Sequence, residues 1–92
     1  MPVYTAYESL TVSTTAVVLT AATYGSCNCA LITVEDATSR VYVDGTVPTA
    51  SVGHEVHDGD IIELESADEL QKFRAIRRDS VNVILRASYG RR

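Results

Sequence analysis

Hydrophobic and polar residues alternate with a period of two along most of this chain. The clearest example is residues 29–36, where Ala30, Ile32 and Val34 fall on one face and Leu31 and Thr33 on the other. Alternation of this kind is typical of β-strands, and apolar residues on both faces indicate a strand that is covered on both sides. The same pattern predicts further strands at residues 7–13, 40–45, 53–57, 60–66, 71–78 and 81–89.

Turn-forming residues separate these segments. Asp44-Gly45 and Asp58-Gly59 are strong turn signals, and Gly25 closes a turn with helical character at residues 20–27. Pro48 has no backbone donor, so residues 46–51 are predicted to be an ordered loop rather than a central strand. Ser66 followed by Glu69 forms a capping box, which predicts a single helical turn at residues 66–70.

Seven to eight short strands at nearly regular spacing predict an all-β fold. No helical pattern is long enough to connect parallel strands. We therefore expect a single domain over residues 1–92, built as a small antiparallel β-sandwich or jelly-roll-like barrel with at most one short helical turn. Residues 1–6 are expected to form an N-terminal arm, and residues 90–92 a frayed tail.

Length and charge narrow the class of protein. The chain has 92 residues and a formal charge of −4, which argues against a nucleic-acid binder. No apolar run approaches the roughly 20 residues of a membrane span, and residues 1–20 lack the basic segment of a signal peptide. We expect a protein made in the cytoplasm that contacts no membrane.

The charge is unevenly distributed. Residues 1–70 contain eleven acids and one base, Arg40, whereas residues 71–92 contain seven bases and one acid, Asp79. This pattern fits strands with solvated charged faces. The less favoured alternative is a basic end that docks on an acidic surface, including that of a neighbouring copy.

The stretch "VGHEVHDGD" holds both histidines, His54 and His57. Residues three apart share a face on a helix but point to opposite faces of a strand. Because Gly53 and Asp58-Gly59 bracket the stretch, we interpret it as an edge strand followed by a turn. A metal- or ligand-binding module built on these histidines remains the less favoured alternative.

Cys27 and Cys29 are two residues apart, a spacing that rarely allows an unstrained disulfide, and two cysteines alone do not complete a zinc site. We expect buried or half-buried free thiols. No serine lies in a nucleophile-elbow context, and no glycine-rich phosphate loop is present. Glu63 and Glu65 share one face of a strand instead of facing each other across a cleft. We therefore expect no enzyme, catalytic residue, metal or cofactor.

The basic segment at residues 71–78 mixes arginine with an aromatic residue, as nucleic-acid platforms do. However, alternation places Arg74, Ile76 and Arg78 on one face and Phe73 in the core. Arginine is enriched in protein interfaces and pairs with carboxylates in bidentate fashion. The segment therefore favours a protein partner over nucleic acid.

One run of the sequence, "VDGTVPTASVGHEVHDGDIIELESADELQKFRAIRRD", resembles small structural proteins encoded among the virion genes of tailed bacteriophages. The shared pattern continues in the strand at Ile32–Glu35, in Phe73–Arg77 and in Leu85–Tyr89, and the opening segment 8–25 fits it too. The resemblance thus covers most of the chain. None of its motifs is catalytic.

The resemblance implies a non-enzymatic virion protein, most simply a capsid decoration (cement) protein that bridges subunits of the major capsid protein. It also implies a symmetric homo-oligomer, with a trimer favoured. A head–tail joint or tail component is the alternative. The partner interface is expected to use the N-terminal arm, the loop at residues 45–51 and the basic face: Pro2, Val3, Tyr4, Tyr7, Thr46, Val47, Pro48, Thr49, Arg74, Ile76 and Arg78.

Overall fold

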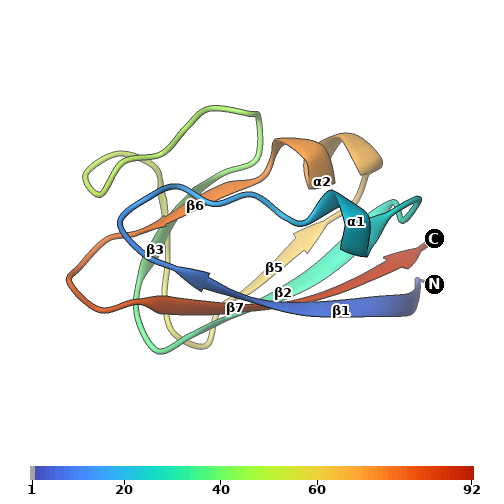
Figure 1. Cartoon of the computed structure of the whole chain (residues 1–92), viewed down its shortest axis with the longest axis horizontal. Coiled ribbons are helices and arrows are strands. Elements are labelled where there is room, and N and C mark those ends of the chain that lie inside the picture. Colours follow the sequence, from blue (N-terminus) through green and yellow to red (C-terminus); the bar gives the residue numbers. More distant parts are fainter. Residues whose placement is uncertain (1) are drawn as a thin grey trace.

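Two antiparallel β-sheets make up the protein in the computed structural model, which describes residues 2–92. One sheet has four strands in the order β1-β7-β2-β5, and the other has three in the order β4-β3-β6 (Figure 1). Two short helices complete the described part. The elements are β1 (Val3–Val12), α1 (Ala21–Tyr24), β2 (Cys29–Glu35), β3 (Ser39–Tyr42), β4 (His54–Val56), β5 (Ile61–Leu64), α2 (Ala67–Lys72), β6 (Arg74–Arg77) and β7 (Val83–Arg91).

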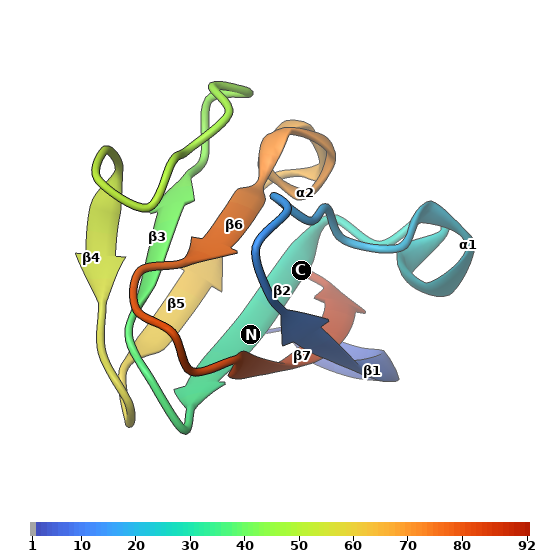
Figure 2. The same cartoon turned by 60° about the vertical axis from the view of Figure 1, so that its left-hand side comes forward.

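The predicted all-β antiparallel class is confirmed. Figure 2 separates the two sheets, with β4, β3 and β6 side by side in one and β5, β2, β7 and β1 in the other. The buried core draws on both sheets, because Val41 and Ala75 from the smaller sheet belong to the same cluster as Ile32 and Leu85 from the larger. The sheets therefore share one core, as the alternation of the sequence requires.

Strand β7 organises the larger sheet, since it pairs with β1 on one side and with β2 on the other. Its residue Leu85 lies between Leu10 and Val34, and Tyr89 lies between Ala6 and Ala30. Burying side chains of this size stabilises the fold by roughly 1.5–3 kcal/mol each. The inward rows of the sheet thus match the hydrophobic positions of the sequence.

The segment between β1 and α1 closes one side of the structure. Val17 exchanges two backbone hydrogen bonds with Ala75 of β6, with N···O distances of 2.7 and 3.0 Å. The amide of Arg77 also donates to the carbonyl oxygen of Ser13. This segment therefore satisfies the open edge of β6 without being a regular strand.

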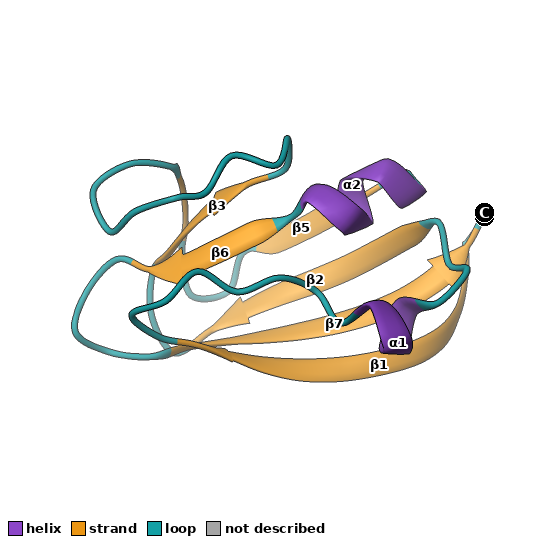
Figure 3. Cartoon of the chain, turned by 45° about the horizontal axis from the view of Figure 1, so that its top comes forward, coloured by secondary structure: helices purple, strands orange, loops and turns teal. Residues whose placement is uncertain are grey.

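Two short helices are present where at most one helical turn was predicted (Figure 3). Gly25 ends α1 at a positive φ of 51°, as the turn prediction required. At α2 the predicted capping residues are in place, because Ser66 Oγ accepts from the amide of Glu69 at 3.2 Å. The helix is longer than predicted, since it continues to Lys72, which forms an ion pair with Asp68 one turn earlier.

Both chain ends differ from the prediction of a free arm and a frayed tail. Val3, the first residue of β1, pairs with Arg91, the last residue of β7, and Tyr4 pairs with Gly90. Both chain ends therefore belong to the β1–β7 ladder. A β-bulge between Tyr4 and Ala6 shifts the register within β1. Met1 lies outside the described residues. Within the described chain, no helix has the length and apolar character needed to cross a membrane.

Candidate functional site

The loop between β3 and β4 (residues 43–53, here the Pro48 loop) has a fixed conformation despite lacking regular secondary structure. Arg40 of β3 donates from Nε to the carbonyl oxygen of Ala50 and from Nη1 to that of Gly53, both at 3.0 Å. Pro48 is fully buried beneath the loop. A Cβ on Gly53 would lie 3.1 Å from Cβ of Arg40 and 3.2 Å from Cβ of Pro48, so the loop packs closely onto that arginine.

Hydrogen bonds within the Pro48 loop hold its far end. The amides of Thr49 and Val52 each donate to the other residue's carbonyl oxygen, at 2.9 and 3.2 Å. Nearer β3, the amide of Thr46 donates to a carboxylate oxygen of Asp44 at 3.0 Å, and this bond lowers the pKa of Asp44. The loop is therefore held before any partner arrives, which reduces the ordering entropy that binding would cost.

Beyond Asp44, the Pro48 loop presents an uncharged surface with exposed apolar side chains. Residues 45–53 contain no charged side chain, and Val47 and Val52 are 64% and 55% exposed. Thr46 and Thr49 are exposed as well. Pro48 is a correction to the predicted interface, because it is fully buried and packs beside Gly53 instead of offering an exposed contact.

The predicted basic face lies beside this loop. Ile76 pairs with Arg40 and Arg74 pairs with Tyr42, in rows that alternate with buried Val41. This places them on the outer face of the three-stranded sheet. All three predicted residues of this face, Arg74, Ile76 and Arg78, are half-buried.

The arginines of this face are engaged within the chain. Arg78 contacts Asp79 at 3.0 Å and Glu55 at 2.5 Å, and these two bonds raise the pKa of Arg78. The bond from Arg78 lowers the pKa of Asp79. Arg74 donates from Nη1 to the carbonyl oxygens of Gln71 and Phe73, both at 3.0 Å. Their guanidinium groups are thus already bonded locally, so the exposed loop is the stronger candidate contact on this side.

The N-terminal candidate residues lie on the other sheet. Val3 and Tyr7 of β1 are 64% and 54% exposed, and Tyr4 is exposed as well. The hydroxyl of Tyr7 accepts a hydrogen bond from Arg86 at 3.0 Å, and Arg86 also binds Glu35 at 2.9 Å. These two partners raise the pKa of Arg86. The predicted interface therefore divides into two surfaces, one on each sheet.

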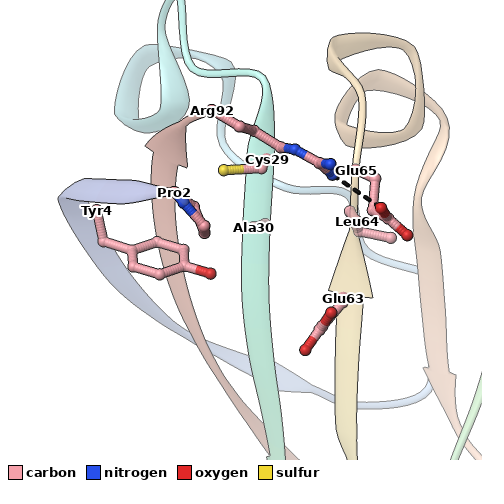
Figure 4. A pocket seen from close by; sticks show the side chains of 8 residues that line it. All are labelled: Pro2, Tyr4, Cys29, Ala30, Glu63, Leu64, Glu65 and Arg92. Carbon is pink, nitrogen blue, oxygen red and sulfur yellow. Dashed lines mark hydrogen bonds and ion pairs between the residues drawn. The ribbon is translucent and has the colours of Figure 1, made fainter.

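A small pocket lies where β1, β2, β5 and the C-terminus meet (Figure 4). Its volume is about 200 Å³, below the roughly 300–1,000 Å³ of typical ligand sites. Arg92 crosses it to reach Glu65 at 2.8 Å. The lining residues are Pro2, Tyr4, Cys29, Ala30, Glu63, Leu64, Glu65 and Arg92.

The two cysteines have different surroundings. Cys27 belongs to the hydrophobic core, with its sulfur 3.8 Å from Oγ1 of Thr5. Cys29 lines the small pocket instead. Both are buried free thiols, as predicted.

The histidine stretch is an edge strand and a turn, as its bracketing glycines predicted. His54 begins β4 and packs edge-on against the ring of Tyr42, with centroids 5.5 Å apart. His57 lies in the turn, with Nδ1 3.4 Å from Oγ1 of Thr38. Asp60 accepts from the amide of His57 at 2.8 Å, which is a turn-stabilising role. Among residues 2–92, no group of three or more His, Cys, Asp or Glu side chains is arranged to hold a metal ion.

The uneven charge of the sequence is largely matched inside the fold. Over the residues that the structure describes, four ion pairs join the basic C-terminal part to the acidic part of the chain that precedes it: Lys72–Asp68, Arg78–Glu55, Arg86–Glu35 and Arg92–Glu65. This supports the interpretation of solvated, internally paired faces over docking of the basic end on another molecule. Exposed pairs of this kind contribute only about 0–1 kcal/mol each.

The role of Arg40 was not predicted from the sequence. The available signal was its position as the single base among the first 70 residues, within the strand that leads into the Pro48 loop. Comparisons with known protein families, with curated proteins and with solved structures return no match to this chain.

Proposed function

We propose that this chain is a non-enzymatic structural protein of a tailed-bacteriophage virion, which decorates the head and bridges subunits of the major capsid protein. The observation that carries the proposal is the placement of two exposed, mainly apolar surfaces on different sheets. One is the Pro48 loop, and the other is the N-terminal half of β1 with Tyr4 and Tyr7. A small protein with two such surfaces can contact two neighbouring subunits at once.

The sequence resemblance to virion proteins supports the same proposal. The Pro48 loop supplies the physical basis for docking, because its residues 45–53 carry no charge, it exposes Val47 and Val52, and it is bonded to Arg40. Rigid apolar anchors that enter a partner's pocket provide most of the affinity of a typical interface. Bridging stabilises a capsid by mass action, so head stability rises with occupancy.

The test is co-sedimentation of the purified protein with empty heads of the phage that encodes it. A Val47→Asp/Val52→Asp variant adds two charges that an apolar contact would have to desolvate, so we expect its affinity for heads to fall about tenfold or more. A matched control, Val18→Asp/Val81→Asp, makes the same change at two exposed valines outside the loop and should bind as the natural protein does. Head melting temperature should rise with the natural protein and the control only.

Two outcomes would contradict the head assignment. A protein that fails to sediment with heads, yet labels tails or the head–tail joint in negative-stain images, would belong to those parts of the virion. Equal binding by the loop variant and the control would remove the Pro48 loop from the interface.

A further inference from the structure

The outer edge of β1 is an open strand edge. Strand β1 contains 10 residues and pairs with β7 on one side. On its other side, none of the residues that the structure describes forms a backbone hydrogen bond to it. A long unpaired edge presents a row of amide and carbonyl groups that can pair with another strand.

The other three sheet edges in the described chain are short or covered. Strand β6 is bonded to Val17 and Ser13 along its outer side. Strand β4 has three residues, including Glu55, and β5 has four, including Glu63. Short length, charge and a covering segment are the devices that protect natural edges from pairing. Strand β1 is longer than these edges, has no segment of the described chain bonded along its outer side, and carries one charged residue, Glu8.

The composition of β1 also suits pairing. Its single charged residue is Glu8, and that carboxylate is already bonded to the hydroxyl of Tyr89 and the amide of Thr20. Leu10 lies in the inward row with Leu85 and is packed against the core, but it stays half-buried because no strand lies beyond it. A further strand on this edge would complete the burial of Leu10.

We propose that β1 pairs with β1 of a second copy of this chain, in an antiparallel ladder whose twofold axis passes beside Leu10. This register sets Leu10 against Leu10 of the second copy and Ser9 against its Thr11. It also sets Glu8 against Val12 of the second copy, so the two carboxylates do not face each other. Because β1 of one copy runs antiparallel to β1 of the other, both copies contribute the same surface. The contact is therefore isologous and closes as a pair of chains.

The bulge after Tyr4 marks one end of the seam, since bulges bend a strand and interrupt its ladder. The inference is independent of the virion assignment. An isologous seam gives pairs of chains rather than the threefold ring that the sequence resemblance implies.

The seam is small. Standard protein interfaces involve roughly 20–30 residues a side, whereas β1 offers 10. Pairing in solution is therefore concentration dependent, and sedimentation equilibrium across roughly 10 µM to 1 mM covers the range of such weak contacts.

The test introduces like charges into the seam. Ser9 and Thr11 are exposed, and in Ser9→Lys/Thr11→Lys the proposed register sets lysine opposite lysine twice. We expect the natural protein to reach the mass of two chains and this variant to remain at one. The control Thr15→Lys/Ser80→Lys adds the same charges at exposed positions outside β1 and should still pair. Circular dichroism confirms that each variant is folded.

A charge-complement experiment completes the test. Mixing Ser9→Lys/Thr11→Lys with Ser9→Glu/Thr11→Glu should restore the two-chain mass, because each lysine then faces a glutamate. Hydrogen exchange should slow at the amides of residues 8–12 in the same mixture. A natural protein that stays at the mass of one chain or forms a trimer, or pairing that survives the lysines, would overturn the proposal.

Discussion

The hydroxyl of Tyr89, near the end of β7, donates a hydrogen bond to the carboxylate of Glu8 in β1. The same carboxylate oxygen accepts from the amide of Thr20, which precedes α1, at 3.0 Å. The ring of Tyr89 is fully buried and meets Tyr24 of α1 edge-on, with centroids 5.7 Å apart. The carboxylate of Glu8 therefore connects the first strand to the last strand and to the start of the first helix.

Replacing Tyr89 by phenylalanine should lower the free energy of unfolding by about 1.5–3 kcal/mol, because Glu8 loses a donor in a partly buried site. Burial, followed by the bond to Glu8, raises the pKa of Tyr89 above the ordinary value of 10.0. Above pH 10 the unfolded chain releases this proton and the folded chain keeps it. The contribution of Tyr89 to the free energy of unfolding is therefore fully present below pH 10. Above pH 10 it falls by about 1.4 kcal/mol per pH unit.

The measurement is urea unfolding between pH 8 and about 11.5, within the range where tyrosines titrate. The Tyr89→Phe variant should show a shallower alkaline loss than the natural protein. Tyr42→Phe is the matched control, since Tyr42 packs against His54 at the other sheet and should leave the alkaline slope unchanged. Equal slopes in the natural protein and Tyr89→Phe would contradict the assignment.

Gly90 allows β1 to approach β7 at the bulge. A Cβ at this position would lie 2.7 Å from the carbonyl carbon of Val3 and 2.8 Å from Cα of Tyr4, closer than real Cβ atoms come. Because both contacts are backbone atoms, no side-chain rotation relieves them. Gly90→Ala should therefore cost about 1–3 kcal/mol and lower the melting temperature by at least about 4 °C.

The effect of Gly90→Ala should be confined to the first residues of β1. Amide exchange should accelerate at residues 3–6, where the first part of β1 would separate from β7. Ser88→Ala, two positions earlier on the same strand, should leave both exchange and melting temperature nearly unchanged. Uniform destabilisation without faster exchange at residues 3–6 would show that Gly90 does not hold the bulge.

The alternation in the sequence was sufficient to predict which residues lie inward wherever a strand is long and central. Ile32, on the predicted inward face of residues 29–36, is fully buried, and so is Leu85 within the predicted strand 81–89. Val43 and Val81 lie within the predicted strands 40–45 and 81–89 but are exposed, because β3 ends at Tyr42 and β7 begins at Val83. A period of two assigns faces but does not show where a strand stops.

Long-range partners were the part that the sequence could not reveal. The N-terminal residues have few local constraints, and their pairing with Gly90 depends on a bulge and on a glycine more than 80 positions away. Arg74 and Ile76 were correctly placed on one outer face. The bonds of Arg74 to backbone carbonyls and of Arg78 to Glu55, however, depend on chain segments whose approach only the folded structure defines.

Arg40 should control the order of the Pro48 loop. It reaches two carbonyl oxygens at once, those of Ala50 and Gly53, through the fixed fork of its guanidinium group. Lysine keeps the charge beside Glu55 but supplies a single flexible ammonium group, which does not reproduce two directed bonds from one plane. In Arg40→Lys we expect amide exchange at Thr49 and Val52 to accelerate about tenfold, which corresponds to roughly 1.4 kcal/mol of lost local stability.

The same variant links loop order to binding. Its affinity for phage heads should fall by a similar factor even though no exposed loop residue has changed, because the loop must then be ordered on docking. Arg77→Lys is the control, since Arg77 bonds to Asn82 at 2.7 Å, outside the Pro48 loop. Faster loop exchange with unchanged head affinity would show that loop order does not contribute to binding. Unchanged exchange at Thr49 and Val52 would show that the loop holds its own conformation and that Arg40 only rests against it.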